Sequence, residues 1–165
     1  MARRRALSLK QPWAALLVAG LKTIEIRRWS TAYRGPVLIH AARIDDDRPE
    51  GWALLTPEFY PLSQRRQGIL GEANLFDCRF YGDAELFAAD VNQHCNAPEW
   101  FEPTGLYGLC FQNIRTVPFV EMPGFVRLFE VEWEEPPALP PALPLAGPPP
   151  AMTDRLTKLL RRGNG

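Results

Sequence analysis

The sequence contains little of what marks several large protein classes. Its three cysteines, Cys78, Cys95 and Cys110, are odd in number and have no paired spacing. This argues against a disulfide framework and favours a reduced, cytoplasmic setting. His94-Cys95 has no matching second pair, and the chain has neither a glycine-rich phosphate loop nor a Gly-x-Ser-x-Gly element. We therefore expect no metal site and no cofactor, and we interpret the acidic run 45–47 as a solvated loop.

Long apolar runs are also missing. The run 13–21 is short, follows Lys10, and leads into the charged segment that begins at Lys22. A secretory signal or a membrane span needs a longer apolar stretch with different flanks. We therefore expect neither of these, and no membrane partner.

The net charge is zero, but the charges are distributed unevenly. Residues 1–35 carry eight Lys or Arg and one acid, Glu25, whereas residues 36–135 carry seven basic and seventeen acidic residues. A basic segment of this kind indicates a polyanionic partner. The alternative is that the acidic middle of the chain folds back and neutralises it.

Short alternating or apolar segments separated by glycine and proline predict a mainly β, α+β domain. The early helix is short and apolar on most sides, with Pro12 in its first turn and Gly20 at its end, so it should be buried. We expect a small barrel of five or six strands, closed or nearly closed, with this helix lining a cleft. The predicted strands cover 7–9, 22–27, 37–42, 69–79, 107–111 and 125–131, with an extended segment over 113–120 and helices over 12–19 and 83–91.

The composition changes near residue 135, where we expect the domain of residues 1–135 to end. Residues 136–150 contain eight of the seventeen prolines, which predicts a stiff linker or a strap across the domain. Residues 151–165 place leucines on one helical face and basic residues elsewhere. This short amphipathic helix either packs on its own domain or binds a protein partner.

The strongest candidate for a functional motif is the segment 20–27, Gly-Leu-Lys-Thr-Ile-Glu-Ile-Arg. It contains three charged residues and a helix-ending glycine. Alternation places Glu25 and Arg27 on one strand face, with Lys22 entering from the rim. A carboxylate between two cations stays ionised and can accept a hydrogen bond from a base amino group, while the cations hold phosphate or polarise a carbonyl. The alternative is an exposed salt bridge.

This pattern resembles the ASCH domain, named for activating signal cointegrator homology and related to the PUA RNA-binding domain. The resemblance covers about residues 6–133. It rests on Gly20-x-Lys22-x-x-Glu25-x-Arg27 together with Leu7-Ser-Leu-Lys-Gln-Pro-Trp13-Ala, Tyr33-Arg34-Gly35, Leu38-Ile39-His40-Ala41, Gly71-Glu72, Tyr107-Gly108 and Pro123-Gly124-Phe125.

The resemblance implies a PUA-like β-barrel whose cleft, between the early helix and the barrel, is lined by the motif. Some relatives bind nucleic acid, a few bacterial ones hydrolyse an acylated cytidine, and ribonuclease activity has been ascribed to others. Lys22 matches the lysine of the amidohydrolases, but Glu25 stands where they have a threonine nucleophile. Thr23 lies two residues early, and Glu72 is a candidate for their later catalytic glutamate.

Other residues are expected in the same cleft. Trp13 stacks a base or packs in the core, and His40 is a hydrogen-bonded core residue or a site residue. A helix N-terminus is a natural phosphate site, and interleaved basic and aromatic residues suit stacking with phosphate contact. These two arguments add Ser8, Lys10, Gln11, Arg28, Tyr33 and Arg34. The alternatives are helix capping for the first three, a merely exposed position for Lys10, and turn closure for Tyr33.

We rank three hypotheses. The first is a binding module for RNA, other single-stranded nucleic acid, or one nucleoside or nucleotide. The second is a hydrolase acting on a modified nucleoside or on RNA, with Lys22 and Glu25 as the essential pair. The third is an adaptor that recruits a protein partner through its proline-rich tail.

Overall fold

The structure is a computed structural model that describes residues 1–139. It contains one sheet of six strands and several short helices. The strands are β1 (Ala2–Leu9), β2 (Ile24–Arg27), β3 (Gly35–Ala41), β4 (Gly68–Tyr81), β5 (Leu106–Glu121) and β6 (Leu128–Trp133). The helices are α1 (Trp13–Val18), α2 (Pro49–Leu54), η1 (Pro57–Phe59), α3 (Tyr60–Ser63), α4 (Ala84–Ala89), α5 (Val91–His94) and η2 (Pro98–Trp100).

The strand order is β2-β5-β4-β3-β1-β6. The β1–β3 pair is parallel and the other pairs are antiparallel. The mainly β class with six strands and an early helix is therefore confirmed. The sheet is not closed into a full barrel, because within residues 1–139 the edge strands β2 and β6 do not pair with each other.

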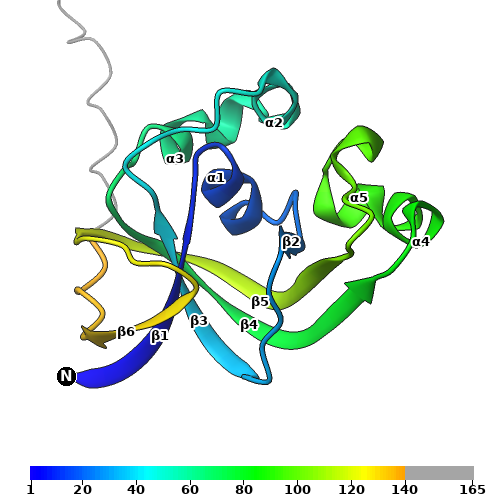
Figure 1. Cartoon of the computed structure of the whole chain (residues 1–165). Coiled ribbons are helices and arrows are strands. Elements are labelled where there is room, and N and C mark those ends of the chain that lie inside the picture. Colours follow the sequence, from blue (N-terminus) through cyan, green and yellow to red (C-terminus); the bar gives the residue numbers. More distant parts are fainter. Residues whose placement is uncertain (140–165) are drawn as a thin grey trace, which may run out of the picture.

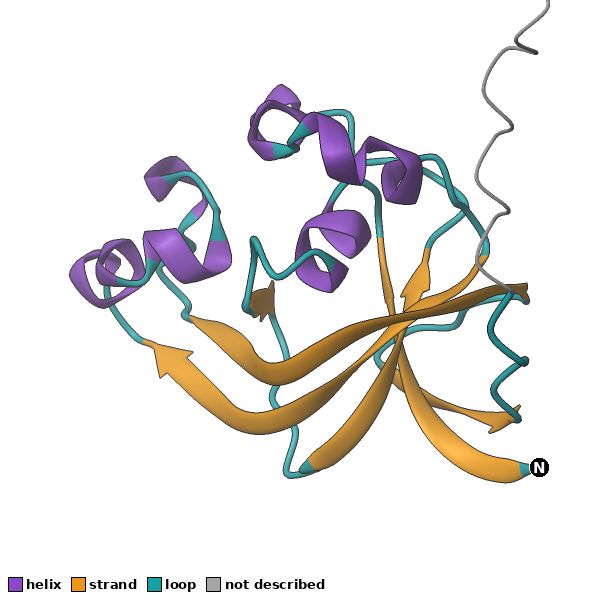
Figure 2. Ribbon diagram, turned by 180° about the vertical axis from the view of Figure 1, so that it is seen from behind, coloured by secondary structure: helices purple, strands orange, loops and turns teal. Residues whose placement is uncertain are grey.

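The sheet is strongly curved, and the helices gather on one side of it (Figure 2). Helix α1 lies over this face, between the α2 and α3 segment and the α4 and α5 segment (Figure 1). All six residues of α1 are buried, as its apolar sequence predicted, and they pack against core residues of β1 and β3. This packing fixes the loops on both sides of α1, from which the candidate site is built.

Two strands differ from the predicted ranges by three residues or more at their starts, and a third is longer than expected. Strand β5 is continuous through Leu106–Glu121, so the two segments predicted there form one strand. Strand β1 begins at Ala2, because its three arginines pair in register with β6, where Arg5 lies opposite Glu130. Strand β6 begins only at Leu128, which leaves residues 123–127 in a loop.

The predicted helix over 151–165 and all but the first four residues of the predicted spacer over 136–150 lie outside the described residues, so the boundary near residue 135 stays a prediction. No helix within residues 1–139 has the length and apolar character needed to cross a membrane.

Candidate functional site

A cleft of about 590 Å³ opens where the end of β1, strand β2 and the loop before β6 meet. Its size falls in the range of pockets that hold small molecules, about 300–1,000 Å³. Four cations and two carboxylates contribute to its walls, together with exposed apolar side chains. The lining residues are Ser8, Lys10, Trp13, Glu25, Ile26, Arg27, Arg28, Ala42, Asp46, Arg48, Asn96, Phe125 and Val126.

A charged triplet of Lys22, Glu25 and Arg27 lies at the floor of the cleft, with Glu25 and Arg27 facing it and Lys22 buried beneath them. The ammonium of Lys22 lies 3.3 Å from Glu25 Oε1, and Arg27 Nη2 donates a 2.9 Å hydrogen bond to Glu25 Oε2. Arg27 Nη2 also donates to the backbone carbonyl of Ser8 at 2.8 Å. The triplet therefore ties β2 to the end of β1 and holds the carboxylate between two cations, as the alternation predicted.

The triplet is buried, so its interpretation as an exposed salt bridge is wrong. The side chain of Lys22 is 0% exposed and that of Glu25 is 11% exposed. Lys22 donates to the backbone carbonyl of His94 at 2.5 Å, and its ammonium lies 5.0 Å from the ring centroid of Trp13. Lys22 does not line the cleft, whereas Glu25 and Arg27 do. Lys22 thus pairs with Glu25 from the buried side, and the side chains accessible to a ligand are those of Glu25 and Arg27.

Burial and charge set the protonation of the triplet. Burial lowers the pKa of Lys22, and the adjacent Glu25 opposes that effect. Burial alone would raise the pKa of Glu25, but the charges and hydrogen bonds of Lys22 and Arg27 outweigh it, so the pKa of Glu25 is lowered. At neutral pH the cleft therefore presents an ionised carboxylate, which only accepts hydrogen bonds, beside a guanidinium, which only donates them.

One wall of the cleft is built around Asp46. Its Oδ2 accepts a 2.8 Å hydrogen bond from the indole Nε1 of Trp13 and a 2.6 Å hydrogen bond from Arg48. The Arg48 guanidinium in turn lies 3.7 Å from the ring centroid of Trp100. The interpretation of residues 45–47 as a solvated loop is therefore wrong for Asp46, which is buried. Hydrogen bonds from Arg48 and Trp13 lower the pKa of Asp46.

Trp13 belongs mainly to the core. It is 6% exposed and packs edge-on against Trp100, with ring centroids 6.0 Å apart. Its residual exposure contributes to the cleft wall. Base stacking on the full face of Trp13 would require displacing these neighbours, so core packing is the better description.

The opposite wall is the loop before β6, which Ser8 and His40 anchor. His40 Nε2 lies 2.8 Å from the carbonyl of Met122, which can only accept, so Nε2 donates and Nδ1 accepts from Ser8 Oγ at 2.9 Å. Burial lowers the pKa of His40, which favours this neutral form. A Cβ on Gly124 would lie 2.5 Å from His40, so the loop can pack this closely only with glycine there.

This loop presents two exposed apolar side chains to the cleft. Phe125 is 62% exposed and Val126 is 86% exposed. Lys10 and Arg28 also line the cleft and are exposed, and Arg28 pairs with Glu102 at 2.8 Å. The mouth of the cleft therefore combines an aromatic surface with cations.

Besides Lys22 and His40, which support the cleft without lining it, four predicted residues lie elsewhere. Gln11 is fully buried, donates to the carbonyls of Leu62 and Arg65, and accepts from the backbone of Ala15, so it caps α1 rather than contacting a ligand. Tyr33 and Arg34 do not line the cleft. Glu72 pairs with Arg4 and Arg115 and also lies outside the cleft, which removes it as a third catalytic group.

Sequence reasoning missed Asp46, Arg48, Asn96 and Phe125. Phe125 could have been found, because an aromatic residue after Pro-Gly is a loop signal. Asp46 and Arg48 carried no such signal, since their roles depend on contacts with Trp13 and Trp100 that only the tertiary fold creates. Within residues 1–139, no group of three or more His, Cys, Asp or Glu side chains is arranged to hold a metal ion.

Comparison with known proteins is consistent with this architecture. The model of the ASCH domain family matches residues 7–115. Human activating signal cointegrator 1 is 31% identical over 101 residues, which are 56% of this chain and 17% of that protein. The chain therefore spans about a sixth of the length of this relative.

Two solved structures share the fold. ASCH from Zymomonas mobilis superposes with a TM-score of 0.51 and 18% identity, covering 72% of this chain and 73% of that one. A mutant form of the same bacterial protein gives a TM-score of 0.52 and 17% identity, covering 72% and 75%. At this level of identity the comparison establishes the fold alone.

Proposed function

Because this chain belongs to the ASCH domain family, in which the likeness to PUA domains links the fold to RNA, we propose that it binds single-stranded RNA and holds one base in the cleft over Glu25 and Arg27. The observation that carries the proposal is the buried triplet. It sets an ionised carboxylate beside a guanidinium at the floor of a cleft of nucleoside dimensions.

The triplet offers a directional pair of contacts. Glu25 accepts from an exocyclic amino group, and Arg27 donates to a ring nitrogen or carbonyl on the same base edge. Cytosine and adenine present an amino group beside an acceptor, whereas uracil has no amino group. An RNA base reaches such a floor only when it is unstacked, which favours a single strand.

The mouth of the cleft supports the rest of the nucleotide. Phe125 is an exposed ring on which a base or sugar can pack. Lys10, Arg28 and Arg48 are the cations nearest to a phosphate that leaves the cleft. Phosphate contacts of this kind make binding weaken as salt is added.

The test is fluorescence anisotropy with single-stranded and duplex oligonucleotides at two salt concentrations. We expect salt-sensitive binding that prefers the single strand. Glu25→Gln and Arg27→Ala should each lower affinity about tenfold or more, since a paired base contact contributes about 1–3 kcal/mol. Arg65→Ala is the matched control, because Arg65 is exposed and does not line the cleft. Equal affinities of all three variants and the native chain would contradict the proposal.

Hydrolysis of a modified nucleoside is a second candidate, supported by the position of Glu25 in the cleft with the Lys22 ammonium 3.3 Å behind it. Glu25 would activate water at the cleft floor, and Lys22 would act through it. Turnover of an N-acylated cytidine that Glu25→Gln abolishes would support this activity. Binding without turnover would leave the first proposal standing alone.

A further inference from the structure

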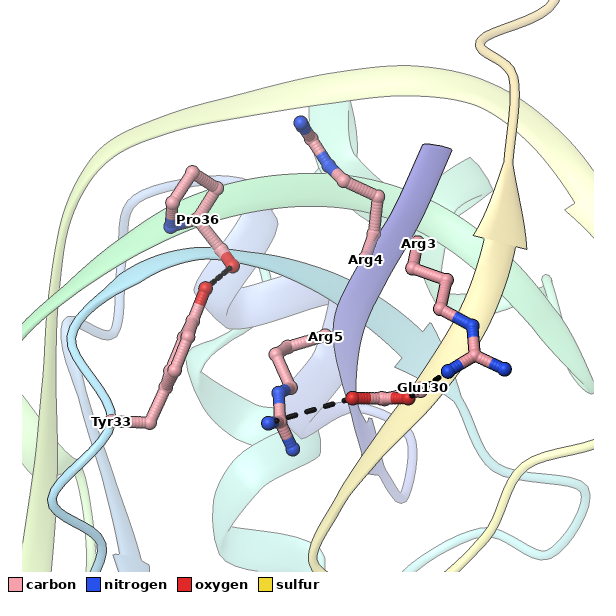
Figure 3. Close-up of a pocket in the computed structure, with 6 residues that line it drawn as sticks. All are labelled: Arg3, Arg4, Arg5, Tyr33, Pro36 and Glu130. Carbon is pink, nitrogen blue, oxygen red and sulfur yellow. Dashed lines mark hydrogen bonds and ion pairs between the residues drawn. The ribbon is translucent and has the colours of Figure 1, made fainter. Parts of the chain in front are cut away.

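A second pocket of about 290 Å³ lies outside the cleft, on the basic start of the chain. Figure 3 shows its six lining residues. Arg3 and Arg5 approach the carboxylate of Glu130 at 3.3 and 3.5 Å, so the two guanidinium groups share one acid. Each arginine therefore keeps donors that this carboxylate does not use.

An aromatic ring accompanies these arginines. The hydroxyl of Tyr33 donates to the carbonyl of Pro36 at 2.8 Å, which fixes the ring at the wall of the pocket (Figure 3). The guanidinium of Arg5 lies 5.4 Å from the ring centroid of Tyr33. Next to it, Arg34 donates to the backbone carbonyls of Thr31 and Tyr33, so these contacts do not neutralise its charge.

Trp29 provides a second aromatic ring with guanidinium neighbours, one of which belongs to the cleft. The guanidinium of Arg27, which lines the cleft, lies 6.0 Å from the Trp29 ring, and that of Arg127 lies 5.8 Å from it. Arg127 directly precedes β6, in which Glu130 lies opposite Arg5. Guanidinium and aromatic groups are therefore paired both beside the cleft and at the second pocket, and β6 pairs with the strand that carries Arg3 and Arg5.

We infer that this surface, here called the outer arginine face and defined by Arg3, Arg5, Trp29, Tyr33 and Arg127, binds the phosphates of nucleotides that flank the base in the cleft. The inference rests on the proposed function and extends it from one nucleotide to a strand. Alternating guanidinium and aromatic groups suit a single strand, since the cations follow the backbone and the rings stack unpaired bases.

This assignment gives Tyr33 and Arg34 a different position from the one predicted for them. Both were expected in the cleft; Tyr33 lines the second pocket instead, and Arg34 donates to the backbone carbonyl of Tyr33. A mononucleotide in the cleft has no flanking phosphates to offer this face. The outer arginine face should therefore affect the binding of oligonucleotides and leave mononucleotide binding unchanged.

The test compares Arg5→Gln/Arg127→Gln with the matched double variant Arg65→Gln/Arg79→Gln, which removes the same charge away from this face. The probes are a single-stranded RNA 12-mer of mixed sequence, followed by anisotropy across a salt series, and CMP and AMP, followed by calorimetry. Loss of two phosphate contacts should lower the slope of log affinity against log salt by about 1.4. Affinity for the 12-mer at low salt should fall at least tenfold, with mononucleotide affinity unchanged.

An unchanged 12-mer slope in Arg5→Gln/Arg127→Gln would overturn the inference, as would an equal loss in the matched variant. If mononucleotides bind in a manner sensitive to Glu25→Gln but the 12-mer binds no more tightly, the inference fails while the cleft proposal stands. If neither probe binds the native chain, both fail.

Discussion

The charged triplet and the outer arginine face use the same chemical groups in opposite surroundings. The Lys22 side chain is 0% exposed, whereas those of Arg3 and Arg5 are 78% and 42% exposed. In the triplet, low dielectric strengthens each interaction and fixes its geometry. On the outer face, water and salt screen the charges. The triplet is therefore suited to selecting a base edge, and the outer face to attracting a polyanion.

This contrast also predicts which substitutions change the stability of the domain and which change only ligand binding. Removing one partner of a buried ion pair leaves an uncompensated charge, whereas exposed pairs contribute little to folding. Substitutions in the triplet should therefore change both stability and binding, and substitutions on the outer face should change binding alone.

The largest expected effect comes from Lys22→Met, which keeps the length of the side chain and removes its charge. Glu25 then stays buried with one cation instead of two, and the carbonyl of His94 loses its donor. We expect the free energy of unfolding to fall by about 3–5 kcal/mol, measured by urea denaturation.

Lys10→Met is the control for that variant, because Lys10 is exposed at the cleft mouth. Its effect on stability should stay within about 0.5 kcal/mol. Equal losses of unfolding free energy in the two variants would contradict the view that the buried triplet stabilises the fold more than an exposed lysine does.

A second effect concerns acid. The pKa values of Glu25 and Asp46 are lowered in the fold, so the unfolded chain binds more protons than the folded chain in mildly acidic solution. The stabilisation from both carboxylates is complete above about pH 4.5 and is lost as the pH falls through their folded values. Unfolding free energies measured from pH 6 to pH 3 should decrease, and Asp46→Asn should make that decrease shallower. A decrease as steep in the variant as in the native chain would rule out a contribution from Asp46.

The smallest effect is expected for Arg5→Gln. The Arg5–Glu130 pair is exposed on both sides and spans 3.5 Å. Its loss should change the free energy of unfolding by less than about 0.5 kcal/mol. Thermal or urea denaturation checks this. A loss above about 1 kcal/mol would show that the outer arginine face stabilises the folded domain.

The fold and the triplet could be predicted because both depend on local patterns. The apolar stretch after Pro12 predicts α1, and the alternation through Lys22, Glu25 and Arg27 predicts a shared carboxylate. The burial of Lys22 could not be predicted in this way, because it depends on α5 and on the carbonyl of His94, far away in the sequence.

Long-range pairing also explains the errors. Three consecutive arginines do not look like a strand, yet β1 begins at Ala2 because Arg3 and Arg5 face the acidic strand β6. The burial of Asp46 was misread, and the choice between capping and ligand contact for Gln11 stayed open, for the same reason. Their hydrogen-bonding partners are supplied by residues that approach only after the chain has folded.

The strand order places β1 between β3 and β6, so the two ends of the domain are joined in one sheet. A fragment cut to residues 7–115, the part that matches the family model, would keep the charged triplet. It would lose β6, the carbonyl that orients His40, and Phe125 at the mouth of the cleft. The segment by which this family is identified is therefore shorter than the segment that must fold together to complete the cleft.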